Sequence, residues 1–270
     1  MTVSGQDRAI DDALATLHEE GCVVLPDVLD HGELREIADR LSGVAESERK
    51  DGTAWFSNGN QRVFNLLNRG QGFVDLIDHP VALALVKGVL GADALLSSIT
   101  ANIAQPGNVP QLLHTDQQYV QAPWFHPLTL NVVWMLDDFT PENGGTRYVP
   151  RSHVVGAPPL TEEIATVPLV GRAGGIALID GRVWHGTGVN RLACEARRGI
   201  FAYYCAPYLR QQENVHRSLR EEVRSGLSAE QQRLLGYDVW QGLGVVDGIP
   251  RHWMGTNRRS GPLDATGDLP

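Results

Sequence analysis

The run that decides the fold lies near the middle of the chain and reads Gln111-Leu112-Leu113-His114-Thr115-Asp116-Gln117-Gln118-Tyr119-Val120. Side chains two apart on a β-strand point to the same face, so a strand at 111–120 would present His114 and Asp116 at one place. With a second histidine and open coordination positions, such a pair makes the three-ligand facial site that holds non-haem Fe(II). The pair alone is a weak signal, because the chain contains 9 histidines and 32 acidic residues.

The sequence around this run has the pattern of short strands and turns that is typical of a β-protein. From Ala94 onward, short segments of strand-forming residues are separated by Gly, Pro and Asn. Eight short strands at this spacing predict a jelly roll or barrel rather than a parallel sheet between helices. The strands that we expect are 95–104, 111–120, 128–136, 145–149, 166–170, 176–180, 184–189 and 198–206.

The remaining segments are predicted to be mainly helical. Apolar residues at helical spacing predict helices and one short strand before Ala94, and a polar helical segment near the C-terminus. These helices are at 10–20, 32–41, 73–90 and 212–235, and the short strand is at 22–26. Residues 45–62 read as a solvated loop whose Trp55 and Phe56 could line a lid or cover an edge of the core.

We therefore predict a single domain over residues 1–270. Its parts are a helical N-terminal flank at about 8–92, a jelly-roll core at about 94–206 and a polar helical extension at about 208–270.

Composition excludes several classes of protein. The 270 residues are 42% hydrophobic and 20% charged, which provides for a substantial core. A net charge of −9 without a basic run argues against nucleic-acid binding. No stretch is apolar enough for a membrane span, and Cys22, Cys194 and Cys205 form no disulfide or metal motif. These features predict a cytoplasmic protein with no membrane or nucleic-acid partner.

A third metal ligand can be sought among the other histidines. His126 lies in a proline-containing loop, and His153 follows a turn where it reads as a partner for local backbone. His185 differs, because it lies in the β-type segment 183–190 and is followed by Arg197 and Arg198. His185 is therefore the strongest candidate.

The arginines have a chemical use if the metal is iron and the cosubstrate is 2-oxoglutarate. That keto acid chelates the metal at one end, and its other carboxylate then needs a cation such as a guanidinium, which can donate two parallel hydrogen bonds. Thr187, two residues beyond His185, is placed to donate a further one.

Three ordered motifs resemble the phytanoyl-CoA dioxygenase-like family of Fe(II)/2-oxoglutarate-dependent oxygenases. They are His114–Gln117, the turn Asp137–Thr146, and His185–Gly188 with Arg197-Arg198. The resemblance covers about residues 14–214. It implies a mainly β fold with flanking helices, whose core is a double-stranded β-helix, the cupin-like jelly roll.

The resemblance also implies roles for individual residues. His114, Asp116 and His185 would hold Fe(II) as the catalytic centre, and Arg197, in preference to Arg198, would bind the distal carboxylate of 2-oxoglutarate. Thr187 and Trp134 fall where the family also contacts this cosubstrate. Relatives that halogenate lack the carboxylate of Asp116, so its presence favours hydroxylation or a related desaturation, cyclisation or epimerisation.

The implied function is oxidation of a small organic molecule with O2, yielding succinate and CO2, as in natural-product tailoring. Candidate substrate contacts flank the metal run or the aromatic loop and are Trp55, Phe56, Asn65, Gln117, Tyr119 and Trp124. A monomer or homodimer is expected. Two alternatives remain: a metal-dependent hydrolase that uses the same three ligands, and a jelly-roll binding protein without catalysis.

Overall fold

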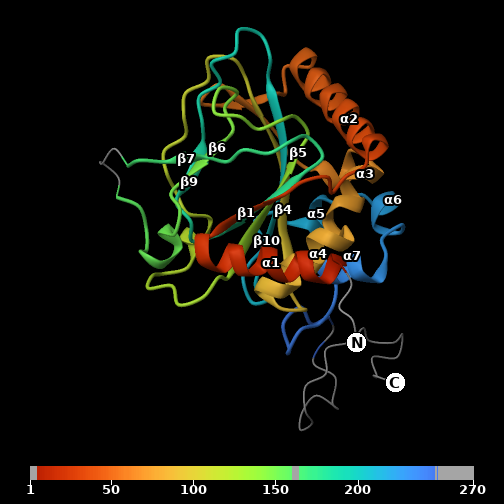
Figure 1. Cartoon of the computed structure of the whole chain (residues 1–270). Helices are drawn as coiled ribbons and strands as arrows, with labels where there is room; N and C mark the ends of the chain where they lie inside the picture. Colours follow the sequence, from red (N-terminus) through yellow and green to blue (C-terminus); the bar gives the residue numbers. More distant parts are fainter. Residues whose placement is uncertain (1–4, 160–163, 247, 249–270) are drawn as a thin grey trace.

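A computed structural model of the chain describes residues 5–159, 164–246 and 248, in which the strands form two antiparallel sheets (Figure 1). The larger sheet contains, in spatial order, β1 (Cys22–Leu25), β8 (Ile176–Asp180), β5 (Thr129–Met135), β10 (Arg197–Cys205), β4 (Leu95–Ala104), β3 (Asn60–Val63) and β2 (Trp55–Ser57). The smaller sheet contains β7 (Val167–Pro168), β6 (Thr146–Tyr148) and β9 (His185–Thr187). The predicted mainly β architecture is confirmed.

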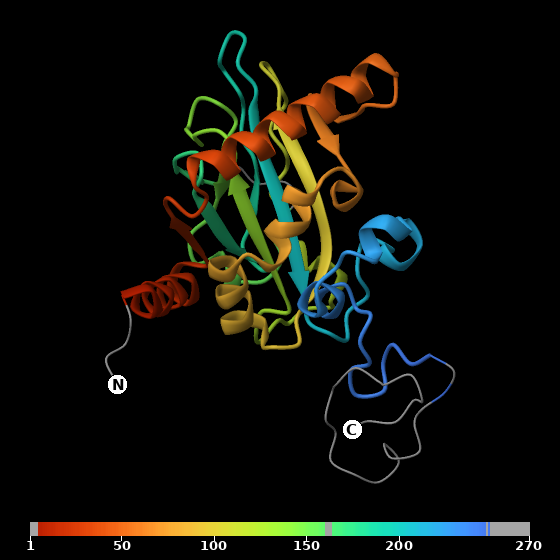
Figure 2. The same ribbon diagram turned by 90° about the vertical axis from the view of Figure 1, so that its right-hand side faces the viewer.

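Helices cover the outer face of the larger sheet. The α-helices are α1 (Gly5–Glu20), α2 (His31–Lys50), α3 (Gln71–Asp75), α4 (Pro80–Leu90), α5 (Val215–Ser218), α6 (Glu221–Arg224) and α7 (Ala229–Leu234). Short 3-10 turns occupy η1 (Leu66–Asn68), η2 (Leu76–Asp78), η3 (Asp116–Tyr119) and η4 (Ser152–Val154). Figure 2 shows α2 crossing the long strands β4, β5 and β10. None of the helices in the described residues combines the length and apolarity needed to span a membrane.

Strand alternation divides the larger sheet into a core face and a site face. On β10, Ile200, Ala202 and Tyr204 are buried in the cluster that includes the helices. The alternate residues Phe201 and Tyr203 line a cavity on the opposite face. Because side chains alternate along a strand, the same strand both anchors the helices and supplies the cavity wall.

The region between α2 and β3 differs from its prediction. α2 continues to Lys50, because Val44 and Ala45 extend its buried face beyond the predicted end at residue 41. The expected loop then becomes the hairpin β2–β3, in which Ser57 pairs with Asn60. Asn58 and Gly59 both have positive φ, the conformation of a two-residue type I′ turn. The Asn-Gly pair was the sequence signal for this hairpin.

Two predicted helices are broken into shorter pieces. The segment 73–90 is divided into α3, η2 and α4, because Pro80 lacks an N–H and so begins a new helix. The segment 212–235 forms α5, α6 and α7 with turns between them. The rest of the predicted extension, from residue 249 onward, lies outside the described residues.

The predicted strand at 111–120 is wrong in an informative way. His114 forms only an isolated antiparallel bridge with His185, and Asp116 already begins η3. The chain turns here because the Gln117 N–H donates to the Gly181 carbonyl at 2.8 Å and the buried Gln117 side chain accepts from the Leu128 N–H at 2.7 Å. His114 and Asp116 therefore do not share one strand face, but a bridge followed by a tight turn brings them to the same place.

Candidate metal centre

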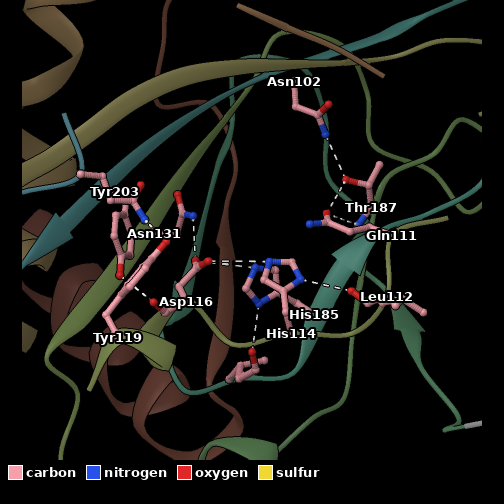
Figure 3. A network of polar contacts seen from close by, with 12 residues as sticks. Asn102, Gln111, Leu112, His114, Asp116, Tyr119, Asn131, His185, Thr187 and Tyr203 are labelled. Carbon is pink, nitrogen blue, oxygen red and sulfur yellow. Dashed lines mark hydrogen bonds and ion pairs between the residues drawn. The ribbon is translucent and has the colours of Figure 1, made fainter. Parts of the chain in front are cut away.

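His114, Asp116 and His185 come together beside β9, with the Asp116 carboxylate directed toward the two imidazoles (Figure 3). Their possible ligand atoms all lie within 4.8 Å of one another. The Asp116 carboxylate faces both imidazoles, with Oδ1 3.8 Å from His114 Nε2 and Oδ2 3.6 Å from His185 Nε2. These separations exceed hydrogen-bond length, and two nitrogens with one carboxylate form the donor set of a facial Fe(II) site.

Backbone carbonyls fix the orientation of both imidazoles. His114 Nδ1 lies 3.2 Å from the Leu112 carbonyl oxygen, and His185 Nδ1 lies 2.9 Å from the Val183 carbonyl oxygen. A carbonyl can only accept, so each Nδ1 carries the proton and each Nε2 lone pair is directed toward Asp116. This is the arrangement in which histidine binds a metal.

The electrostatic surroundings keep His114 neutral. Burial lowers the pKa of His114, and the neighbouring His185 lowers it further, against the opposing effect of Asp116. Metal binding requires the neutral imidazole, so these surroundings favour a ligand rather than an imidazolium ion.

Asp116 is held by two side chains of the larger sheet. Asn131 Nδ2 donates to Asp116 Oδ2 at 3.0 Å, and the Tyr203 hydroxyl donates to the Asp116 backbone carbonyl at 2.8 Å. Asn131 on β5 and Tyr203 on β10 are direct cross-strand partners.

A cavity of about 300 Å³ opens beside the triad. Its wall combines the two histidines and Asp116 with polar and aromatic side chains from both sheets. The other lining residues are Arg62, Ser98, Thr100, Asn102, Gln111, Gln118, Tyr119, Asn131, Thr146, Gly186, Thr187, Phe201, Tyr203 and Gln212. A second cavity of about 510 Å³ shares Tyr119, Tyr203 and Gln212 with the first.

Arg197 is fully buried behind the Asn102–Thr187 end of this cavity. Its Nη2 donates to the Gly144 carbonyl at 2.6 Å, and its Nη1 donates to the Asn102 carbonyl at 3.4 Å. Nε has no hydrogen-bond partner, and the guanidinium carbon lies 4.3 Å from the centre of the Phe139 ring. Within the described chain no carboxylate pairs with Arg197, and burial lowers its pKa to about 9. An unpaired buried cation is costly, so an anionic ligand would stabilise Arg197 here.

Arg198 points the other way. Its guanidinium forms an ion pair with Asp137, at 2.6 Å between Nη2 and Oδ1, and donates to the Ser42 hydroxyl of α2 at 2.8 Å. These contacts tie β10 to α2 on the helical side of the sheet. Of the two arginines, Arg197 is the one that hydrogen-bonds to a residue lining the cavity, Asn102.

Thr187 lies between the triad and Arg197. Its hydroxyl accepts a 3.0 Å hydrogen bond from Asn102 Nδ2 and donates to Gln111 Oε1 at 3.3 Å. Asn102 Oδ1 is buried without a partner. Thr187 and Asn102 both line this end of the cavity.

Trp134 does not lie where the family resemblance implied, which corrects that expectation. Trp134 is three residues beyond Asn131 on β5. Its side chain therefore lies on the face of the strand opposite the cavity. It is fully buried among the helices and packs edge-to-face against His79, with ring centres 5.3 Å apart. The structure gives Trp134 a place in the core, away from the cosubstrate end of the cavity.

The structure separates the six candidate substrate residues. Only Tyr119 lines the cavity beside the triad, while Gln117 lines the second cavity and holds the backbone of Leu128. Each of the other four makes a local contact or lies at the surface. Trp55 packs on Phe64, Trp124 donates to the Val120 carbonyl, Asn65 accepts from Asn68, and Phe56 is exposed and pairs across the β2–β3 hairpin with Gln61.

Several residues of the site carried no recognisable sequence signal. Asn131 and Tyr203 belong to segments that read simply as strands, and Arg62 belongs to a segment predicted as a loop. Arg62 lines the cavity close enough to Asp116 for the carboxylate to oppose the lowering of the Arg62 pKa by burial. Strand alternation in the sequence predicts that Asn131 and Trp134 lie on opposite faces of β5. It does not predict which of the two faces holds the metal.

Comparison with known proteins gives the family. The family model for phytanoyl-CoA dioxygenase (PhyH) matches residues 17–199. The chain belongs to this family. Among curated proteins, the dioxygenase af480 of Aspergillus fumigatus is 36% identical over 237 residues, which cover 84% of this chain and 76% of that protein. The predicted family is therefore confirmed, and with it the class of enzyme, a dioxygenase.

Several proteins of known structure share the fold of this PhyH-family chain. HygX from Streptomyces hygroscopicus, solved with nickel, 2-oxoglutarate and hygromycin B, superposes with a TM-score of 0.63 at 18% identity, covering 74% of this chain and 88% of HygX. SnoK, a non-haem α-ketoglutarate-dependent carbocyclase from nogalamycin biosynthesis, gives 0.63 at 20% identity, covering 84% and 94%. The jelly-roll fold of 2-oxoglutarate-dependent enzymes is thus confirmed for this chain.

Proposed function

We propose that this dioxygenase holds Fe(II) with His114, Asp116 and His185 and uses 2-oxoglutarate and O2 to oxidise a small organic molecule. The observation that carries the proposal is the buried Arg197, which has no carboxylate partner in the described chain and lies beyond Thr187 from the metal ligands. A dicarboxylate chelated at the metal would bring its distal carboxylate toward this guanidinium. A metal-dependent hydrolase or a binding protein has no use for such a cation.

The residues present fit both groups. Two imidazole Nε2 atoms and one carboxylate provide the protein ligands of a facial iron site and leave positions for other ligands. Arg197 Nε is a buried donor without a partner, and a carboxylate is an acceptor that can use it. Buried polar atoms are usually hydrogen-bonded, so a missing partner at a cavity points to a ligand.

Each residue then has a stated task. When bound, iron with 2-oxoglutarate and O2 supplies the oxidation, and 2-oxoglutarate leaves as succinate and CO2. Arg197 binds the distal carboxylate, and the Thr187 hydroxyl donates to the same group when it turns from Gln111 Oε1. The backbone carbonyls of Leu112 and Val183 hold the imidazoles in the binding tautomer, and the sheets exclude bulk water from the deep end of the cavity.

The substrate is a small molecule that enters beside Tyr119. The cavities on either side of Tyr119 and Tyr203 have volumes of about 300 and 510 Å³, the size of drug-like ligand pockets. Hydroxylation, or a related desaturation, cyclisation or epimerisation in natural-product tailoring, is the reaction we propose. The single domain, the cytoplasmic location and the monomeric or dimeric state expected from the sequence remain part of this proposal.

Succinate formation tests the proposal. Purified protein with Fe(II), 2-oxoglutarate and O2 should release succinate, and candidate small molecules that act as substrates should raise the rate. Asp116→Ala should release none. If the iron-loaded protein formed no succinate with or without any candidate, while Zn²⁺ supported hydrolysis, the hydrolase alternative would replace this proposal.

A further inference from the structure

The three metal ligands are not held in the same way. His114 and His185 are oriented by backbone carbonyls two residues before them, Leu112 and Val183. These contacts are local and use no side chain other than the imidazole itself. Asp116 is different, because its carboxylate contacts a side chain 15 residues away in sequence, Asn131.

The segment that carries Asp116 also needs outside support. Asp116 begins η3, outside the strands of both sheets, after the isolated bridge between His114 and His185. The bridge ties the segment to the smaller sheet through β9, whereas Asp116 must face the imidazoles from the side of the larger sheet. A carboxylate at the start of a four-residue turn is free to rotate unless other groups fix it.

Asn131 and Tyr203 supply these contacts from the larger sheet. They are cross-strand partners on β5 and β10, and both line the cavity. Tyr203 donates to the backbone carbonyl of Asp116 at 2.8 Å, and Asn131 donates to Oδ2 at 3.0 Å. Figure 3 shows both on the side of Asp116 away from the two imidazoles.

The chemistry of the two donors suits this task. A carboxylate only accepts hydrogen bonds, so the Asn131 amide must present its nitrogen to Asp116, which leaves its own buried Oδ1 without a partner. The Tyr203 phenol has a single O–H, and it donates this to the Asp116 backbone carbonyl. The Asn131 amide thereby fixes the rotation of the carboxylate, so that Oδ1 faces His114 Nε2 at 3.8 Å and Oδ2 faces His185 Nε2 at 3.6 Å.

We propose that Asn131 and Tyr203 form a cross-strand clamp that positions Asp116 for metal binding, with Asn131 fixing the rotation of the carboxylate and Tyr203 fixing the backbone beneath it. Both are positioning residues, since each acts through Asp116. The clamp rests on the proposed metal triad. It also explains why a buried β-strand carries a polar amide at residue 131, between the buried apolar side chains of Leu130 and Val132.

The test is the affinity for Fe(II), measured anaerobically by competition with a colorimetric ferrous chelator and by the rise in melting temperature on adding Fe(II). Asn131→Ala should weaken Fe(II) binding about 10–100-fold, the usual effect of losing a group that orients a metal ligand. Tyr203→Phe should weaken it less. The double variant should weaken it by more than the product of the two, because each donor partly holds Asp116 when the other is missing.

Val133→Ala is the matched control. Val133 is buried on the same face of β5 two residues from Asn131, but it contacts an apolar cluster and not the cavity. It should lower the melting temperature and leave the Fe(II) affinity unchanged. Unchanged affinity in both Asn131→Ala and Tyr203→Phe, or equal loss in Val133→Ala, would overturn the clamp. Failure of the unmodified protein to bind Fe(II) would instead overturn the metal triad, and the clamp with it.

Discussion

His114 and His185 face each other across an isolated antiparallel bridge, with ring centres 4.5 Å apart and each Nδ1 directed at the carbonyl two residues earlier in the chain. The bridge joins the loop before β5 to the smaller sheet at β9. Because both imidazoles then present Nε2 toward Asp116, the pairing of two backbone segments creates the nitrogen half of a metal site.

Removing either imidazole should therefore abolish Fe(II) binding. His114→Ala and His185→Ala each leave two protein ligands, too few to compete with water and buffer for the metal. His126→Ala is the control, because His126 is exposed and lies outside the triad. Equilibrium dialysis with iron analysis measures the effect. Equal iron retention by His185→Ala and His126→Ala would contradict the assignment.

Arg197→Ala should weaken 2-oxoglutarate binding while leaving Fe(II) binding intact. Two charge-assisted hydrogen bonds of about 1.5–3 kcal/mol each predict a loss of at least about 100-fold. The 2-oxoglutarate affinity of Arg197→Lys should lie between those of the unmodified protein and Arg197→Ala, because an ammonium keeps the charge but loses the paired donors. Isothermal titration of the iron-loaded protein with 2-oxoglutarate measures the affinities.

Arg198→Ala is the comparison for that experiment. It removes the ion pair with Asp137 and the bond to Ser42 on the helical side, so it should lower stability and leave 2-oxoglutarate affinity unchanged. A larger loss of affinity in Arg198→Ala than in Arg197→Ala would reverse the roles of the two arginines.

Trp134→Leu should act on stability alone. Trp134 is fully buried against His79 among the helices, so truncation should cost about 2 kcal/mol of unfolding free energy, measured by urea titration. The affinity for 2-oxoglutarate should not change, whereas Thr187→Val should lower it. A selective loss of affinity in Trp134→Leu would restore the cosubstrate contact that the family resemblance implied.

The ion pairs of Glu230 should contribute to the stability of the folded protein in a pH-dependent way. The side chains of Arg233 and Lys87 lower the pKa of Glu230 to about 2. The Arg233 pair lies within α7, and the Lys87 pair joins α7 to α4. Since the folded-state pKa lies below the unfolded value of about 4.3, this stability is present above pH 5 and is lost as pH falls toward 2.

Glu230→Gln should therefore lower the urea midpoint at pH 7 by an amount equivalent to at most about 1 kcal/mol, because the pair is partly exposed. The difference from the unmodified protein should shrink at pH 3. A difference that is constant between pH 7 and pH 3 would show that Glu230 contributes by packing and not by charge.

The sequence predicted the chemistry of the site better than its geometry. His185 could be chosen because few kinds of side chain bind a metal, whereas the preference for Arg197 over Arg198 came from the family resemblance. The strand at 111–120 could not be corrected from sequence, because the bonds that turn it come from Gly181 and Leu128, which are distant from Asp116 in the chain.

Strand parity explains the other differences. Asn131 and Trp134 lie on opposite faces of β5, but the choice of the metal face depends on how the sheets and helices pack. The β2–β3 hairpin was predictable from Asn58-Gly59, a pair typical of two-residue turns. Of the six candidate substrate residues only Tyr119 lines the cavity beside the triad, because proximity in sequence to a metal ligand does not specify the direction of a side chain.

The most direct test of the account is the visible absorption of the protein titrated anaerobically with Fe(II) and 2-oxoglutarate together. A keto acid chelated to Fe(II) at the triad predicts a weak charge-transfer band that requires both additions and is absent in Asp116→Ala. If Fe(II) and 2-oxoglutarate both bound to the protein and no such band formed, the cosubstrate would not be chelated at the metal, and the central claim would be wrong.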